Sequence, residues 1–311
     1  MRNYDDPGAP VYTGGSPAGS VRGQTLRVVT FNLKWGREID RAADLLSRPG
    51  PLRDADLVVL EEMDRPATER LAAALGMSWV YVPSAVHPVP KKDFGVALLS
   101  PWPLEDARKL PLPHLSRFRK LRRSAAVATL HSPLGPIRVY GIHFESPAGA
   151  WDRVRRDQGQ AVLADAAGWA GPVVVVGDFN GRAGPQVLAS AGFSWPTEKV
   201  KNTAGPFDFD HVLARGLCPA GPGAAAAAAV PAGHRPRART WSKSKIPAVF
   251  FTASVAQKKP AAASTRGPAR PLKSPAAKIG PAQLSASART ARAWSRRTSS
   301  RAPAGLSRWI P

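Results

Sequence analysis

The feature that most constrains the fold is the segment from residue 173 to residue 180, Val-Val-Val-Val-Gly-Asp-Phe-Asn. Four consecutive β-branched residues predict a strand that is buried on both faces. Gly177 allows a sharp turn, so Asp178 and Asn180 are expected where the strand ends. Open α/β sheets bind ligands at that edge, which makes both residues candidates for a functional site. Because Asp and Asn also favour turns, the segment alone leaves a purely structural role equally open.

The hydrophobic pattern on either side of this strand predicts an α/β fold. Apolar residues at i, i+3/i+4 and i+7 indicate helices, and short apolar runs indicate strands. Strands first alternate with helices and then, from Trp79 onward, are joined by turns, which favours two mixed sheets covered by helices. The expected strands are 26–32, 57–60, 79–82, 94–99, 125–130, 137–143 and 173–176, and the expected helices are 39–46, 66–75 and 151–168.

The net charge of +22 belongs almost entirely to the C-terminal third of the chain. Asp210 is the last acidic residue, and residues 211–311 contain 18 Lys and Arg. Residues 1–210 therefore hold the remaining 26 basic residues and all 22 acidic ones, a net charge of +4. Strong duplex binding rests on many Lys and Arg contacts to phosphates, so the charge of the folded part gives it little support.

The composition divides the chain into three parts. Residues 1–24 are rich in Gly, Pro and Ser and are expected to be a disordered lead, and residues 25–238 form the folded domain. Residues 239–311 form a basic tail rich in Ala, Pro, Arg and Ser, which cannot build a core. The tail is either a natural disordered arm or the product of a reading frame lost after Leu213, and we favour the second hypothesis. An uninterrupted open frame in the gene would contradict it.

Several classes of protein are disfavoured by composition. The single cysteine, Cys218, excludes an internal disulfide, and no Cys/His cluster indicates zinc. The N-terminus lacks the apolar region of a secretory signal, and no apolar run is long enough to span a bilayer. We therefore expect a cytoplasmic protein, and the oligomeric state stays open.

Polar residues follow the apolar runs of five separate strands. A capping or turn role accounts for any one of them, but together they are the residue types that phosphate-ester hydrolysis needs. Carboxylate oxygens hold Mg²⁺, and a nearby base activates the attacking water. The set is Asn32, Glu62, His143, Asp178, Asn180 and Asp210.

The segments TFNLKWG, LVVLEEMD, GVALLSPWPL, RRSAAVATL, YGIHFES, VVVVGDFN and FDFDHVLARG, in this order, resemble the endonuclease/exonuclease/phosphatase superfamily with its DNase-I-like fold. The resemblance covers residues 25–217. It implies a four-layer α/β/β/α sandwich of two mixed β-sheets flanked by helices, with the active site at the sheet edges. It also implies one or two divalent ions, usually Mg²⁺ with Mn²⁺ as the alternative, and a phosphodiester or phosphomonoester substrate.

The resemblance assigns roles to the residues at the strand ends. Glu62, the second Glu of LEE, matches the metal ligand, and Asn32 matches the asparagine beside the metal. Asp178 resembles the carboxylate that aligns or deprotonates the attacking water. Asn180 resembles the amide that binds a phosphoryl oxygen, and His143 the histidine that contacts the phosphate and protonates the leaving oxygen.

The end of the domain departs from the family pattern. Asp210 resembles the carboxylate that orients a final histidine, and His234 is the nearest match to that histidine. Gly233 stands where the family has Asp, and residues 236–239 make a poor strand, which leaves the last strand in question. His234 is either the catalytic histidine or part of an altered tail, and both interpretations stay open. Glu61 is interpreted as a neighbour of the metal ligand.

Other residues receive secondary interpretations. Arg122 and Arg123 resemble the family's basic position near the site and are candidates for substrate binding, although arginines at a strand start are usually solvated. His211 is expected to pack, and Trp35 is expected in the core in preference to the cleft.

The sequence thus predicts a Mg²⁺-dependent phosphodiesterase of nuclease type in which water attacks phosphorus in line, with a nucleic acid as the candidate partner. One alternative is a lipid or inositol phosphate esterase of the same superfamily. The other, from a different class, is an inactive chain whose basic tail binds polyanions.

Overall fold

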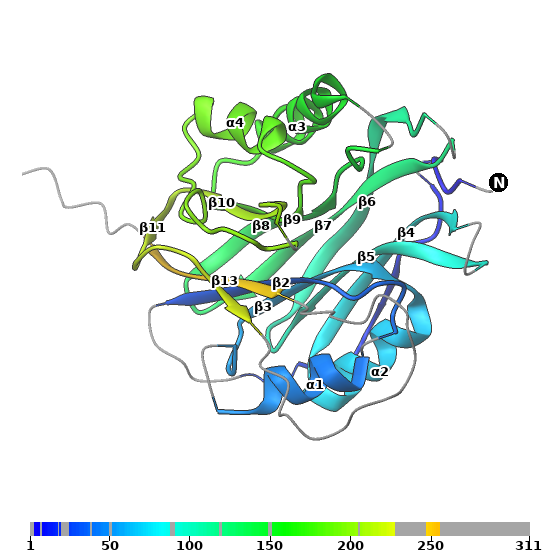
Figure 1. The fold of residues 1–311 in the computed structure, drawn as a ribbon. Helices are drawn as coiled ribbons and strands as arrows, with labels where there is room; N and C mark the ends of the chain where they lie inside the picture. Colours follow the sequence, from blue (N-terminus) through cyan, green and yellow to red (C-terminus); the bar gives the residue numbers. More distant parts are fainter. Residues whose placement is uncertain are drawn as a thin grey trace, which may run out of the picture. The chain divides into compact units, whose positions relative to one another are not determined.

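The computed structural model describes residues 3–255, apart from residues 7, 18, 20–24, 38, 50–51, 88–90, 118–119, 149–150, 205 and 228–246. Within these residues two β-sheets pack face to face, and helices cover their outer faces (Figure 1). This arrangement is the predicted four-layer α/β/β/α sandwich. No helix in the described residues is long and apolar enough to cross a membrane.

The first sheet is mixed and, in the described residues, has eight strands. Its order is β1-β4-β5-β3-β2-β13-β11, and β12 also pairs with β13. Only β2 and β3 run parallel, and the other pairs are antiparallel. The strands are β1 Tyr12–Gly14, β2 Leu26–Asn32, β3 Leu57–Met63, β4 Ser78–His87, β5 Lys92–Ser100, β11 Leu217–Pro219, β12 Ala224–Ala227 and β13 Pro247–Val255.

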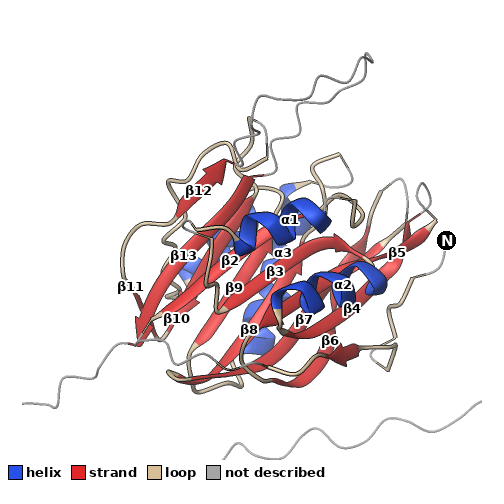
Figure 2. Ribbon diagram, turned by 90° about the horizontal axis from the view of Figure 1, so that it is seen from below, coloured by secondary structure: helices blue, strands red, loops and turns tan. Residues whose placement is uncertain are grey.

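The second sheet has the order β10-β9-β8-β7-β6 and is parallel only between β8 and β9. Its strands are β6 Leu104–Leu115, β7 Arg122–Ser132, β8 Gly135–His143, β9 Val173–Asp178 and β10 Asp210–Arg215. Helices α1 (Ile39–Ser47) and α2 (Arg65–Leu75) cover the first sheet, as Figure 2 shows from below. Helices α3 (Asp152–Ala166) and α4 (Ala183–Ser190) cover the second.

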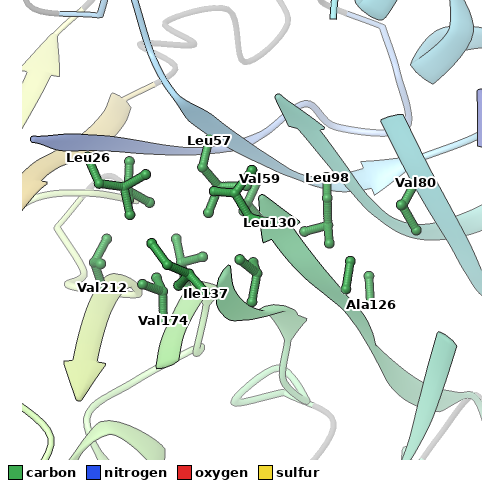
Figure 3. Packing of buried hydrophobic residues seen from close by; sticks show 14 of the residues in the cluster. Leu26, Leu57, Val59, Val80, Leu98, Ala126, Leu130, Ile137, Val174 and Val212 are labelled. Atoms are coloured by element: carbon green, nitrogen blue, oxygen red, sulfur yellow. The ribbon is translucent and has the colours of Figure 1, made fainter. Parts of the chain in front are cut away.

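An apolar layer between the sheets holds the sandwich together (Figure 3). Alternate residues of each strand face this layer because side chains in a strand alternate between its two faces. Val174 and Val176 belong to the layer, whereas Val173 and Val175 pack beneath the outer helices. The four valines of β9 are thus buried on both faces, as predicted.

Ordered structure extends beyond both predicted ends of the domain. In the predicted disordered lead, β1 pairs with β4 through Tyr12 opposite Tyr81, and the two rings stack. In the predicted tail, β13 pairs antiparallel with β2, with Phe251 opposite Val28. Both corrections have the same origin, because aromatic and β-branched residues interrupt segments whose average composition favours disorder. The reading-frame hypothesis stays a prediction, and residues 256–311 lie outside the described part of the chain.

The edge strand β6 has no counterpart among the predicted strands. Its sequence contains Pro111 and Pro113, which argue against a central strand because proline cannot donate to a ladder. In the structure β6 pairs only with β7, and an edge position tolerates both prolines.

His211 generates a prediction about acid stability. Its ring is buried in β10 and lies 5.0 Å from the Trp195 ring and 5.9 Å from that of Phe179, the packing role that the sequence favours. Burial lowers the pKa of His211 to about 4. The unfolded chain therefore binds more protons below pH 6.5, so the folded state loses stability as the pH falls from about 6.5 to about 4.

We expect His211→Phe, which keeps a ring in this position, to reduce the loss of unfolding free energy between pH 7 and pH 4 by about 3 kcal/mol. Urea denaturation at a series of pH values measures the free energy of unfolding of the wild type and the variant. The exposed His131 gives the control, His131→Phe. An equal pH dependence in the wild type and His211→Phe would contradict the expectation.

Candidate active site

Strand pairing brings the predicted residues of the second sheet into one row. β9 lies between β8 and β10, and Asp178 pairs in register with His143 on one side and Asp210 on the other. In the first sheet, Asn32 ends β2 beside β3. The Nδ2 atom of Asn32 lies 3.3 Å from Oδ2 of Asp178, so the two sheets meet at this edge.

A β-bulge turns Glu62 toward the site. The register of β3 against β5 shifts between Glu61 and Met63, and Glu62 adopts a left-handed backbone conformation with φ of 57°. Regular alternation would place Glu62 on the helix-covered face. The bulge instead brings its Oε1 atom to 3.3 Å from Nδ2 of Asn32.

Glu62 and Asn32 suit a magnesium ion more closely than a zinc ion. Among the described residues no three His, Cys, Asp or Glu side chains converge into a metal cage. Mg²⁺ needs no such cage, because it is usually bound through one or two carboxylates and completes its shell with water. Burial raises the pKa of Glu62, and a bound cation would favour its charged form. Glu62 would hold the ion, with Asn32 beside it.

The turn after β9 fixes Asp178 and Asn180. Gly177 has a φ of 141°, and a Cβ atom there would lie 2.0 Å from the carbonyl oxygen of Ile142, so this position requires glycine. The backbone N–H of Asn180 donates to Oδ1 of Asp178 at 2.8 Å. The side-chain amide of Asn180 donates one hydrogen to the carbonyl oxygen of Phe144, which leaves its second hydrogen for another acceptor.

His143 lies beside Asp178, with 3.6 Å between Nε2 and Oδ2. Burial lowers the pKa of His143 well below its usual value, and the charge of Arg123 lowers it further. The imidazole is therefore neutral near pH 7 in the free chain. It can donate a hydrogen bond to a phosphoryl oxygen, but it does not hold the extra proton that the resemblance assigns to the acid.

Glu61 and Asp210 form a second, deeper layer of carboxyl groups. Burial raises the pKa of both well above the usual range, and the charge of Asp210 adds to the effect on Glu61. The Thr30 hydroxyl donates to Oε1 of Glu61 at 2.7 Å. The buried Oδ1 of Asp210 has no hydrogen-bond partner within the described part of the chain. This atom is where the resemblance expects the final histidine, and His234 itself lies outside the described residues.

The structure separates the two predicted arginines. Arg122 points to the N-terminal segment, with its Nε 3.2 Å from Oδ2 of Asp5. Arg123 is buried at the site, lies 3.5 Å from Oε2 of Glu145, and keeps a buried Nη1 that has no partner in the described residues. Of the two arginines, Arg123 lines the cavity at this edge and Arg122 does not.

Residues from both sheets enclose a cavity of about 410 Å³ at this edge. Its polar wall contains Glu62, Arg123, His143, Asp178 and Asn180. These are five of the residues that the sequence predicts, gathered from four strands and the turn after β9.

Sequence reasoning missed other residues that line the cavity. Glu145 follows His143 by two positions in GIHFES, a spacing that could have identified it. Its backbone N–H donates to Oε1 of Gln158 and its carbonyl accepts from Arg155, both on α3. Three of the others are the aromatic residues Trp35, His87 and Phe94, and Trp35 therefore lies in the cleft instead of the core.

The comparisons with known proteins agree with this geometry. Residues 29–229 match the profile of the Endonuclease/Exonuclease/phosphatase family. No curated protein sequence matches the chain.

Solved structures share the fold. An endonuclease/exonuclease/phosphatase from Beutenbergia cavernae is 19% identical with a TM-score of 0.56, over 75% of this chain and 72% of that one. Sphingomyelinase C from Streptomyces griseocarneus is 20% identical with a TM-score of 0.52, over 74% of this chain and 99% of the sphingomyelinase. The human nocturnin catalytic domain with bound sulfate is 17% identical with a TM-score of 0.52, over 79% of this chain and 97% of the nocturnin domain.

The position of Glu62 predicts a metal-dependent gain in stability. A ligand that binds only the folded state stabilises it by about 2.7 kcal/mol at a hundredfold excess over its Kd. We expect 10-fold steps in Mg²⁺ concentration to raise the melting temperature of the wild type and to leave that of Glu62→Gln nearly constant. Glu69→Gln, on the exposed face of α2, is the matched control. An equal rise in Glu62→Gln would place the ion elsewhere.

Proposed function

Because the chain belongs to the endonuclease/exonuclease/phosphatase family, whose members hydrolyse mostly phosphoric esters, we propose that it is a Mg²⁺-dependent phosphodiesterase of nuclease type. The observation that carries the proposal is the convergence of Glu62, His143 and Asp178 at one cavity, with Asn32 hydrogen-bonded to Glu62 and Asp178. These residues come from strands of two different sheets, and the cavity contains the groups that metal-assisted attack of water on phosphorus requires.

Each residue has a role that its contacts support. Asp178 orients the attacking water, because the N–H of Asn180 and the amide of Asn32 hold its carboxylate in place. Burial raises the pKa of Asp178, which makes it a better base than a solvated aspartate. A bound Mg²⁺ would polarise a phosphoryl oxygen and offset charge on it.

Three donors face the developing charge on the phosphoryl group. Asn180, Arg123 and His143 all line the cavity, and each side chain can donate a hydrogen bond to a phosphoryl oxygen. Donors fixed in place before the reaction stabilise a transition state more than mobile water does. The leaving oxygen takes its proton from solvent or from the histidine that would partner Asp210, for which His234 is the candidate.

The balance of charge favours a diester over a monoester. The cavity contains the carboxylates of Glu62, Glu145 and Asp178, and Arg123 is its only Lys or Arg among the described residues. A phosphodiester carries one negative charge, whereas a phosphomonoester carries close to two at pH 7 because its second pKa is about 6. One arginine and one divalent ion balance the three carboxylates and leave little excess for a dianion.

Hydrolysis of bis(p-nitrophenyl) phosphate with Mg²⁺ and with EDTA tests the proposal. We expect turnover that EDTA abolishes. Turnover of sphingomyelin or a phosphoinositide without turnover of any nucleic acid would favour the lipid esterase instead.

The two neighbouring arginines provide an internal control. We expect Arg123→Gln to lower kcat/KM by about 100- to 1000-fold, the range for losing one transition-state donor. Arg122→Gln should stay within a few-fold of the wild type, because Arg122 faces Asp5. Melting temperatures of both variants separate loss of the donor from loss of the fold. Equal effects of the two substitutions would contradict the assignment.

A further inference from the structure

A row of rings forms the wall of the cavity beside the polar groups. The ring of Trp35 lies 5.4 Å from that of His87, which lies 5.5 Å from Phe94, which in turn lies 5.5 Å from His143. All four residues line the cavity. The row therefore leads directly from the proposed phosphate position to Trp35, and the proposed mechanism uses only its last member.

Trp35 is held at the cavity by an unusual backbone. Lys34, Trp35 and Gly36 all have left-handed φ values, of 46°, 65° and 67°. Non-glycine residues in this region cost free energy, and such strain is concentrated at functional sites. The turn is anchored by Asn32, whose Oδ1 accepts from the N–H of Lys34 at 3.1 Å. The same asparagine that contacts Glu62 and Asp178 thus also sets the position of the indole.

Trp35 is half-buried, whereas His87 and Phe94 are buried, so Trp35 is the ring that can offer a face to a planar group. Aromatic side chains bind nucleobases by stacking, and they do so with little regard to base identity because every base has a π face. A cavity of about 410 Å³ is within the range of small-ligand pockets, which is about 300–1000 Å³. It has room for one base and its sugar phosphate rather than for a duplex.

The cations on the rings argue against the other ligand that aromatic walls bind, a quaternary ammonium such as choline. The guanidinium of Arg37 lies 4.9 Å from the centroid of Trp35, and that of Arg123 lies 4.8 Å from the centroid of Phe94. Trp35 and Phe94 each already have a guanidinium over the ring, and this positive charge repels a second cation. A neutral planar base meets no such repulsion.

We propose that Trp35, backed by the buried rings of His87 and Phe94, forms a subsite that stacks one nucleobase of the phosphate ester. The inference deepens the proposed function, because it assumes that the phosphate binds at the polar wall. A base can enter the subsite only when it is unstacked from its neighbours, so single-stranded ends and short oligonucleotides are better ligands than duplex DNA.

Binding tests the subsite without any need for turnover. Calorimetric titration of the full chain with Mg²⁺ compares thymidine 5′-monophosphate with 2-deoxyribose 5-phosphate, which lacks the base. We expect the nucleotide to bind about 5- to 140-fold more tightly, the factor that corresponds to about 1–3 kcal/mol for stacking one base.

Variants of Trp35 assign that preference to the ring. Trp35→Leu should abolish it without changing the affinity for the sugar phosphate, and Trp35→Phe should keep most of it. Trp151→Leu, at an exposed tryptophan outside the cavity, should leave it unchanged. Equal binding of both ligands by the wild type, or an unchanged preference in Trp35→Leu, would overturn the inference.

Hydrolysis separates this inference from the proposed function. The substrates are thymidylyl-thymidine and its analogues in which either base is replaced by hydrogen, so the leaving oxygen is the same. We expect Trp35→Leu to lower kcat/KM only for the base-bearing substrate, and to leave the rate on p-nitrophenylphosphorylcholine unchanged. A selective loss on the choline ester would overturn the nucleobase assignment. Base-selective binding without hydrolysis of any diester would contradict the proposed function and preserve the subsite.

Discussion

The pairing of β9 with a parallel neighbour on one side and an antiparallel neighbour on the other is the constraint on which the site depends. The parallel strand β8 contributes its C-terminal end and the antiparallel strand β10 its N-terminal end, so His143 and Asp210 reach the same edge as Asp178. Four valines alone do not fix this register, because a slip of one residue replaces valine with valine. Gly177 fixes it, since any side chain at that position would collide with the carbonyl oxygen of Ile142.

The apolar layer between the sheets explains why the site lowers the stability of the fold. Its edge buries the carboxyl groups of Glu61, Asp178 and Asp210 near one another, and burial raises the pKa of all three. Like charges gathered in a poorly solvated place destabilise the fold unless cations or donors offset them. Within the described residues, Oε2 of Glu61, Oδ1 of Asp210 and Nη1 of Arg123 have no hydrogen-bond partner, and a bound ion, a phosphate and a further donor would satisfy them.

Local signals predict two mixed sheets covered by helices and the residues at the strand ends, and the family resemblance adds the four-layer arrangement. Buried strands appear as apolar runs, and a polar residue after such a run lies at a sheet edge whatever the topology is. The hydrophobic pattern alone does not direct Glu62 to the site, because a bulge reverses its direction, and the resemblance is what predicts it. The separation of Arg122 from Arg123 and the position of Trp35 depend on segments that are distant in sequence, namely residues near Asp5 and His87. Average composition predicted disorder where β1 and β13 form, because a few aromatic residues suffice to pair a strand with an existing sheet.

The measurement that tests this account most directly is the Mg²⁺-dependent turnover of an aryl phosphodiester by Asp178→Asn. The half-buried Asp44 on α1, which lies outside the cavity, provides the control, Asp44→Asn. The amide of asparagine keeps the shape of the side chain and cannot act as a base. The account predicts a fall in kcat of at least about 100-fold for Asp178→Asn, the lower range for general base catalysis, with an unchanged rate for Asp44→Asn. Equal rates in the wild type and Asp178→Asn would show that the chemistry does not take place at the end of β9.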